Sequence, residues 1–159
     1  MSKFIGVKMV EAVPMTAGEA ANKGYRTPVA EKPTDLNLEG YEVTYPDGYK
    51  SWCPKDVFEE SNRHIDNMTF GFAIEALKKG LKVARKGWNG KGMYLWLKPA
   101  VTIKSDWCKD PMLKEIVDAN GGEAEALGTI CMKTADNKIL TGWLASQTDV
   151  LSEDWVIIE

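Results

Sequence analysis

Hydrophobic residues at helical spacing mark one segment of the chain, between Thr69 and Gly80. The residues that recur every three or four positions are Phe70, Ala73, Ile74 and Leu77. This spacing places them on one face of a helix. Thr69 suits the N-cap position and Gly80 suits the C-terminal end. The pattern therefore predicts one amphipathic helix.

Short apolar segments follow this helix and predict strands. They lie at residues 81–85, 93–97, 128–133, 138–144 and 155–158, and the turn residues 135–137 join the third to the fourth as a hairpin. A second helix could span Pro111 to Ala119, before a run of Asn and two glycines. Strands joined by short turns favour an α+β fold, with a mostly antiparallel sheet and one amphipathic helix packed on it.

The first 66 residues have a different character. Residues 4–13 are apolar and we expect Pro14 to end that strand, whereas residues 17–38 are rich in Gly, Pro, Asn and Thr and read as a loop. Residues 41–45 and 49–53 flank the turn signal Pro-Asp-Gly, which predicts a β-hairpin. Pro54 can then start a short helix over residues 54–59. We expect a small β-hairpin/helix module over residues 1–66 and a second domain over residues 67–159.

Charge is distributed unevenly along the chain. The 159 residues carry a net charge of −3, but residues 76–105 contain eight Lys and Arg and no Asp or Glu. Such a segment would attract a small anion, while the acidic remainder disfavours a long nucleic-acid backbone. We therefore expect no DNA or RNA partner. The alternative, a lysine-rich face that only confers solubility, stays open.

Residues for catalysis or metal binding are scarce. The three cysteines are widely spaced, which favours buried free thiols over a zinc site or disulfide framework, and His64 is the only histidine. Asp149, Glu153 and Asp154 could form an acid/base pair, but helix capping and solvent exposure explain them better. We expect no enzyme activity, no catalytic residue, no metal and no cofactor. The apolar runs are short and the first residues do not resemble a signal peptide, so we expect a cytoplasmic protein without membrane contact.

Two segments could recognise a nucleotide. In residues 86–92, glycines expose backbone N–H groups beside two lysines, Trp88 and Asn89, and Tyr94 follows closely. Aromatic faces can stack on a base while amides and lysines bind phosphate. A strand connection whose tryptophan closes the core would have the same sequence. The second segment, residues 142–149, follows Trp143 with a run of hydrogen-bonding residues. An ordinary polar turn or helix cap explains that run equally well.

Several motifs in one order resemble a family of phage and prophage proteins. The motifs are Met68-Thr69-Phe70-Gly71, residues 83–95, Met132-Lys133-Thr134-Ala135-Asp136, residues 143–149 and Glu153-Asp154-Trp155. Over residues 68–159 the chain resembles the second type of Thoeris anti-defence protein. The segment from Lys98 to Gly128 is longer than in the shortest members. Residues 1–66 resemble a module found beside other phage domains, for which no activity is assigned.

The resemblance implies a function for residues 67–159. Family members assemble as tetramers with pockets between protomers, and they bind glycocyclic ADP-ribose, the signal made by the TIR-domain enzyme of Thoeris defence, without degrading it. By this resemblance Trp88 and Trp143 are stacking platforms. The further expected contacts are Arg85, Asn89, Tyr94, Ser146, Gln147 and Asp149. The expected function is thus sequestration of an immune signal in the cytoplasm of the infected host. The alternatives are a sponge for other cyclic di- or oligonucleotides, or a phage structural or adaptor protein.

Overall fold

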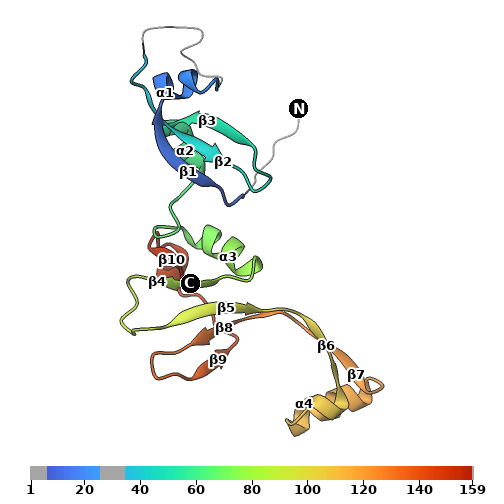
Figure 1. Ribbon diagram of the computed structural model, residues 1–159. Helices are drawn as coiled ribbons and strands as arrows, with labels where there is room; N and C mark the ends of the chain where they lie inside the picture. The colour runs from blue at the N-terminus through green and yellow to red at the C-terminus, as the bar shows by residue number, and fades with distance from the viewer. Residues whose placement is uncertain (1–6, 26–34, 159) are drawn as a thin grey trace. The chain divides into compact units, whose positions relative to one another are not determined.

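The computed structural model describes residues 7–25 and 35–158, which contain helices together with antiparallel sheets (Figure 1). This confirms the α+β fold class. The chain divides into two compact units, Met1–Arg63 and His64–Glu159. None of the described helices is long and apolar enough to cross a membrane.

The first unit is a three-stranded sheet with two short helices. Its elements are β1 (Glu11–Thr16), α1 (Ala17–Asn22), β2 (Glu39–Thr44), β3 (Lys50–Pro54) and α2 (Lys55–Ser61). The strands pair antiparallel in the order β1-β2-β3, so the predicted hairpin of β2 and β3 is confirmed. The predicted short helix is also present as α2, with Pro54 at its N-cap.

Two predictions for this unit were wrong. Pro14 does not end the first strand, since β1 continues to Thr16. Because β1 is an edge strand, a proline that lacks an N–H is tolerated there. Residues 17–38 are not all loop, since α1 occupies their start and residues 26–34 lie outside the described residues. Thr16 and Glu19 form a capping box, a helix-start signal that the Gly, Pro, Asn and Thr of the segment obscured.

Trp52 organises the core of the first unit. Its ring packs with Met15 and two alanines of α1, and its Nε1 donates a hydrogen bond to the Met15 carbonyl at 2.9 Å. A side chain at Gly40 would overlap the Trp52 ring and the Cys53 carbonyl. Gly40 therefore leaves the space that the indole fills.

The second unit is built on a five-stranded antiparallel sheet. Its elements are α3 (Phe70–Lys78), β4 (Lys82–Arg85), β5 (Tyr94–Lys98), β6 (Val101–Lys104), η2 (Ser105–Trp107), α4 (Pro111–Ala119), β7 (Glu123–Ala126), β8 (Thr129–Lys133), β9 (Ile139–Thr141), α5 (Gln147–Val150) and β10 (Trp155–Ile158). The strand order is β10-β4-β5-β8-β9. The predicted amphipathic helix is confirmed as α3, which packs its buried residues Ala73 and Leu77 with Leu95 and Trp155.

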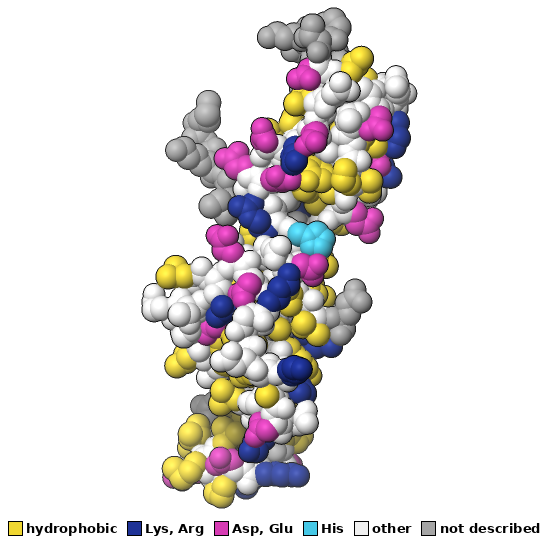
Figure 2. Space-filling model, turned by 90° about the vertical axis from the view of Figure 1, so that its left-hand side faces the viewer, with side chains coloured by type: hydrophobic (Ala, Val, Ile, Leu, Met, Phe, Trp, Pro, Cys, Tyr) yellow, Lys and Arg dark blue, Asp and Glu magenta, His cyan; other side chains and the backbone are white. Residues whose placement is uncertain are grey.

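An arm extends from the sheet between β5 and β8 (Figure 1). It consists of the strand pair β6 and β7 with η2 and α4 between them, and the predicted helix at Pro111–Ala119 is confirmed as α4. Val117 is the only buried residue of α4, whereas Trp107, Met112 and Ile116 are at least 60% exposed. Figure 2 shows hydrophobic side chains gathered at the lower end, the level at which Figure 1 draws this arm.

Candidate functional site

The two candidate segments meet at the end of β4. The β4–β10 register pairs Arg85 with Trp155, so the residues just after β4 lie beside those just before β10. The loop at residues 86–92, called the glycine loop below, begins at this point, and α5 precedes β10 in the chain. Sheet pairing thus brings together residues more than 60 positions apart.

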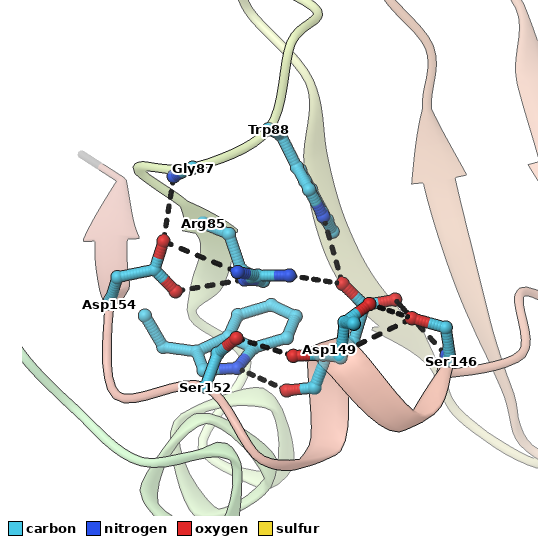
Figure 3. A network of polar contacts seen from close by, with 9 residues as sticks. Arg85, Gly87, Trp88, Ser146, Asp149, Ser152 and Asp154 are labelled. Carbon is cyan, nitrogen blue, oxygen red and sulfur yellow. Dashed lines mark hydrogen bonds and ion pairs between the residues drawn. The ribbon is translucent and has the colours of Figure 1, made fainter.

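Arg85 joins two carboxylates at the centre of this region (Figure 3). Its Nη1 lies 2.8 Å from Oδ1 of Asp149, and its Nε lies 2.8 Å from Oδ1 of Asp154. The three side chains are largely buried, with exposed fractions of 15% for Arg85, 12% for Asp149 and 31% for Asp154. One guanidinium and two carboxylates leave this cluster with a net charge of −1.

Asp149 also caps α5 and holds two indoles. Ser146 occupies the N-cap position, and its backbone N and Oγ donate to Oδ2 of Asp149 at 3.1 and 2.7 Å. Nε1 of Trp88 donates to Oδ1 of Asp149 at 3.1 Å, and Nε1 of Trp155 donates to its carbonyl at 3.0 Å. The helix-cap reading of residues 146–149 therefore describes their local structure.

These contacts keep both carboxyl groups ionised at neutral pH. Burial alone would raise the pKa of Asp149, but hydrogen bonds from Ser146, Arg85 and Trp88 outweigh it and lower the pKa to about 2. The hydrogen bond from Arg85 is the main cause that lowers the pKa of Asp154. The same pairing raises the pKa of Arg85.

Four aromatic rings pack against one another, and two of them, Trp88 and Trp155, donate hydrogen bonds to Asp149. Trp155 is fully buried, and its ring centroid lies 5.5 Å from that of Trp88, 6.3 Å from that of Trp143 and 5.3 Å from that of Phe70. Trp88 and Trp143 are half-buried, with centroids 6.2 Å apart and planes inclined by 65°. Each of these two rings packs on the core and also keeps an exposed part.

The glycine loop is held at both ends. Oδ2 of Asp154 accepts a hydrogen bond from the Gly87 backbone N at 2.7 Å, and Nζ of Lys133 donates to the Gly92 carbonyl at 3.0 Å. Gly92 has a φ of 70°, a conformation that favours glycine. Asn89 is exposed between these two anchors.

The structure does not bring all expected site residues together. Arg85, Trp88, Trp143, Ser146 and Asp149 lie within one cluster. Asn89 is exposed on the glycine loop, and Gln147 is exposed at the start of α5. Tyr94 lies on the other face of the sheet, because neighbouring Leu95 points into the core beneath α3. The Lys82 and Lys133 ammonium groups lie 5.4 and 6.0 Å from the Tyr94 ring centroid.

Two residues of the site were absent from the sequence prediction. Asp154 was assigned to an acidic cluster and a motif, and Lys133 to a strand and a motif, but neither was predicted as a site residue. The Glu153-Asp154-Trp155 motif places Asp154 next to a strand, but its contact with Arg85 depends on a pairing 69 positions away.

Residues that could ligate a metal, the cysteines included, form no cluster of metal ligands in residues 7–25 and 35–158 of the structure. No group of three or more His, Cys, Asp or Glu there is placed to hold a metal ion. The cysteines are free, but the expectation that all are buried was wrong: Cys131 is buried, while Cys53 and Cys108 are half-buried.

Comparison with known proteins covers the second unit. Residues 68–158 match the family model of the Thoeris anti-defense 2-like domain. A curated relative, Thoeris anti-defense 2 of Bacillus phage SP01, is 43% identical over 98 residues, an alignment that covers 57% of this chain and 94% of the relative. The matched residues include the glycine loop, the residues around α5 and the Arg85 cluster, and they contain no residue of the first unit. The chain therefore belongs to the Thoeris anti-defense 2-like family.

Proposed function

We propose that this protein binds glycocyclic ADP-ribose and holds it intact, so that the effector of Thoeris defence is not activated. Its family is one of anti-defence proteins, and its relative is named for action against Thoeris. The protein would act in the cytoplasm of the infected bacterium as a homotetramer.

The pair of half-buried indoles beside a fixed glycine loop is the observation that carries this proposal. A base stacked on an aromatic side chain gains about 1–3 kcal/mol. The planes of Trp88 and Trp143 are inclined by 65°, so one flat base can lie parallel to only one of them. The second indole would then contact an edge of that base or another part of the ligand.

Charge favours a particular arrangement of the ligand. Arg85 is already paired with two carboxylates, so we assign the phosphates to the exposed Lys86 and Lys91 of the acid-free segment. Asn89, Gln147 and Ser146 are exposed and would contact the ribose or the base edge.

The remaining site residues have indirect roles in this proposal. Arg85 and Asp149 would hold Trp88 in place, because Oδ1 of Asp149 accepts hydrogen bonds from both the Arg85 guanidinium and the Trp88 indole. Tyr94, on the opposite sheet face, would reach a pocket only in a neighbouring protomer of the proposed tetramer.

Binding without cleavage fits the ionisation of the site. General acid catalysis needs a proton donor with a pKa near the working pH. Asp149 and Asp154 both have lowered pKa values and are paired with Arg85, so neither carries a proton at neutral pH.

Recovery of the ligand tests the proposal. Purified protein is incubated with glycocyclic ADP-ribose, freed of unbound ligand and heated, and the supernatant is analysed by mass spectrometry. We expect intact ligand in proportion to protein. Recovery of cleaved product alone would instead indicate an enzyme. Retention of cyclic dinucleotides but not glycocyclic ADP-ribose would indicate the alternative sponge, and retention of no nucleotide would favour an adaptor.

Tryptophan variants test the location of the site. Loss of one stacking ring, in Trp88→Ala or Trp143→Ala, should weaken binding by about 5- to 150-fold. Trp107→Ala, which removes an exposed indole of the arm, is the matched control and should bind like the wild type. If Trp88→Ala or Trp143→Ala prevents soluble expression, that indole acts mainly in the core, and the corresponding phenylalanine variant then tests stacking.

A further inference from the structure

The glycine loop is rich in flexible residues, but hydrogen bonds to side chains outside the loop hold both of its ends. Gly87, Gly90 and Gly92 fall within seven residues, and glycine loses more backbone entropy on ordering than any other residue. The first anchor is the hydrogen bond from the Gly87 N to Asp154, and the second is the hydrogen bond from Lys133 to the Gly92 carbonyl. Side chains outside the loop thus fix both of its ends.

We infer that Asp154 is a positioning residue, which orders the loop at residues 86–92 for the ligand without touching the ligand. Oδ2 of Asp154 holds the Gly87 backbone N, while its Oδ1 accepts from Arg85 Nε. Arg85 in turn binds Asp149, and the oxygen that it contacts also accepts from the Trp88 indole. The inference rests on the proposed function, since it names what prepares that same site.

Close packing supports this role. A Cβ atom at residue 87 would lie 2.7 Å from Oδ2 of Asp154 and 3.4 Å from Nη2 of Arg85. The carboxylate therefore approaches the backbone as closely as only glycine allows. The Lys86 N donates to the Asp154 carbonyl at 3.1 Å, and the Trp88 N donates to the Arg85 carbonyl at 3.3 Å. These backbone contacts fix the start of the loop together with the Asp154 carboxylate and the hydrogen bond from the Trp88 indole to Asp149.

Order before binding has a measurable consequence. A loop that is already in its bound conformation loses less entropy when the ligand arrives, which strengthens affinity without a new contact. Loss of the Asp154 anchor should therefore weaken binding and loosen residues 86–92 in the free protein. The bound ligand should restore much of that order.

Hydrogen exchange and affinity, measured on the full chain, test the inference. We expect Asp154→Ala to bind glycocyclic ADP-ribose about tenfold more weakly and to exchange residues 86–92 faster when free, with exchange close to that of the wild type at saturation. Asp154→Asn, whose amide oxygen can still accept from Gly87, should lie between the two. Glu153→Gln changes the exposed neighbouring carboxylate and should match the wild type in both measurements.

A second variant covers the opposite anchor. Lys133→Met removes the hydrogen bond to Gly92 while keeping an apolar stem, and it should loosen the same loop and weaken binding in the same way. If Asp154→Ala does not fold, Asp154→Asn and Lys133→Met show whether the order of the loop sets the affinity. A purely structural role would instead raise exchange throughout the sheet and leave it raised at saturation.

The outcomes separate this inference from the proposed function. Unchanged loop exchange in Asp154→Ala and Lys133→Met would overturn the inference, and so would wild-type affinity in a variant whose loop is loosened. If the wild type itself binds no glycocyclic ADP-ribose, the proposed function fails. Faster exchange confined to residues 86–92 would still support the anchoring by Asp154.

Discussion

Replacement of Asp149 by asparagine tests the central cluster most directly. Each carboxylate oxygen of Asp149 accepts two hydrogen bonds: Oδ1 from Arg85 and Trp88, and Oδ2 from the backbone N and Oγ of Ser146. An asparagine amide has one accepting oxygen and one donating nitrogen. Whichever way it is turned, its NH2 group faces an N–H donor that has lost its partner.

The size of the effect follows from these contacts. A hydrogen bond to an ionised group contributes about 1.5–3 kcal/mol, and Asp149→Asn loses the charge beside Arg85 as well as one N–H partner. The lowered pKa, which has the same hydrogen bonds as its cause, leads to a similar magnitude, since the difference between 3.8 and about 2 corresponds to about 2 kcal/mol. We therefore expect the free energy of unfolding of residues 64–159 to fall by about 2–4 kcal/mol.

Urea denaturation followed by tryptophan fluorescence measures this change. Five of the six tryptophans lie in the second unit, so the signal reports mainly on it. Glu153→Gln is the matched control and should leave the midpoint unchanged. A loss of less than about 0.5 kcal/mol in Asp149→Asn, the usual limit for a surface substitution, would show that the cluster contributes little to stability.

Two further predictions concern pH and packing. Because the folded pKa of Asp149 is depressed, its contribution is complete above about pH 5 and is lost as the pH falls through about 2. Urea midpoints from pH 5 to 2 should therefore fall more steeply for the wild type than for Asp149→Asn, and parallel slopes would contradict this. Gly40→Ala should destabilise the first unit by about 1–3 kcal/mol, because its Cβ overlaps the Trp52 ring. Hydrogen exchange of the first sheet measures that loss. Exchange of the first sheet as slow in Gly40→Ala as in the wild type would refute the packing argument.

Local patterns in the sequence predicted much of the fold. Periodicity located α3, and turn signals located the hairpins of β2 with β3 and of β8 with β9. These features depend on residues close together in the chain. The helix α1 was missed because the Gly, Pro, Asn and Thr of residues 17–38 outweighed the capping box of Thr16 and Glu19. The strands β6 and β7 were missed because each is only four residues long and β7 has no apolar residue larger than alanine.

The site was predictable in its parts but not in its assembly. The glycine loop and the run after Trp143 were both identified from residue types. Their connection through Arg85 was not predicted, because it depends on the pairing of β4 with β10. The alternation in β5 could have warned that Tyr94 and Leu95 face opposite ways, but the sequence does not say which face the helix covers.

The pairing of Lys98 with Thr129 closes the β5–β8 ladder immediately before the arm begins. The whole arm is therefore the connection of a single hairpin, and both of its ends leave the sheet at adjacent positions. Insertions and deletions between these two residues can change the length of the chain while every strand of the sheet keeps its register. A short turn or a reporter sequence could therefore replace residues 99–128, which leave β5 at the end opposite to the glycine loop.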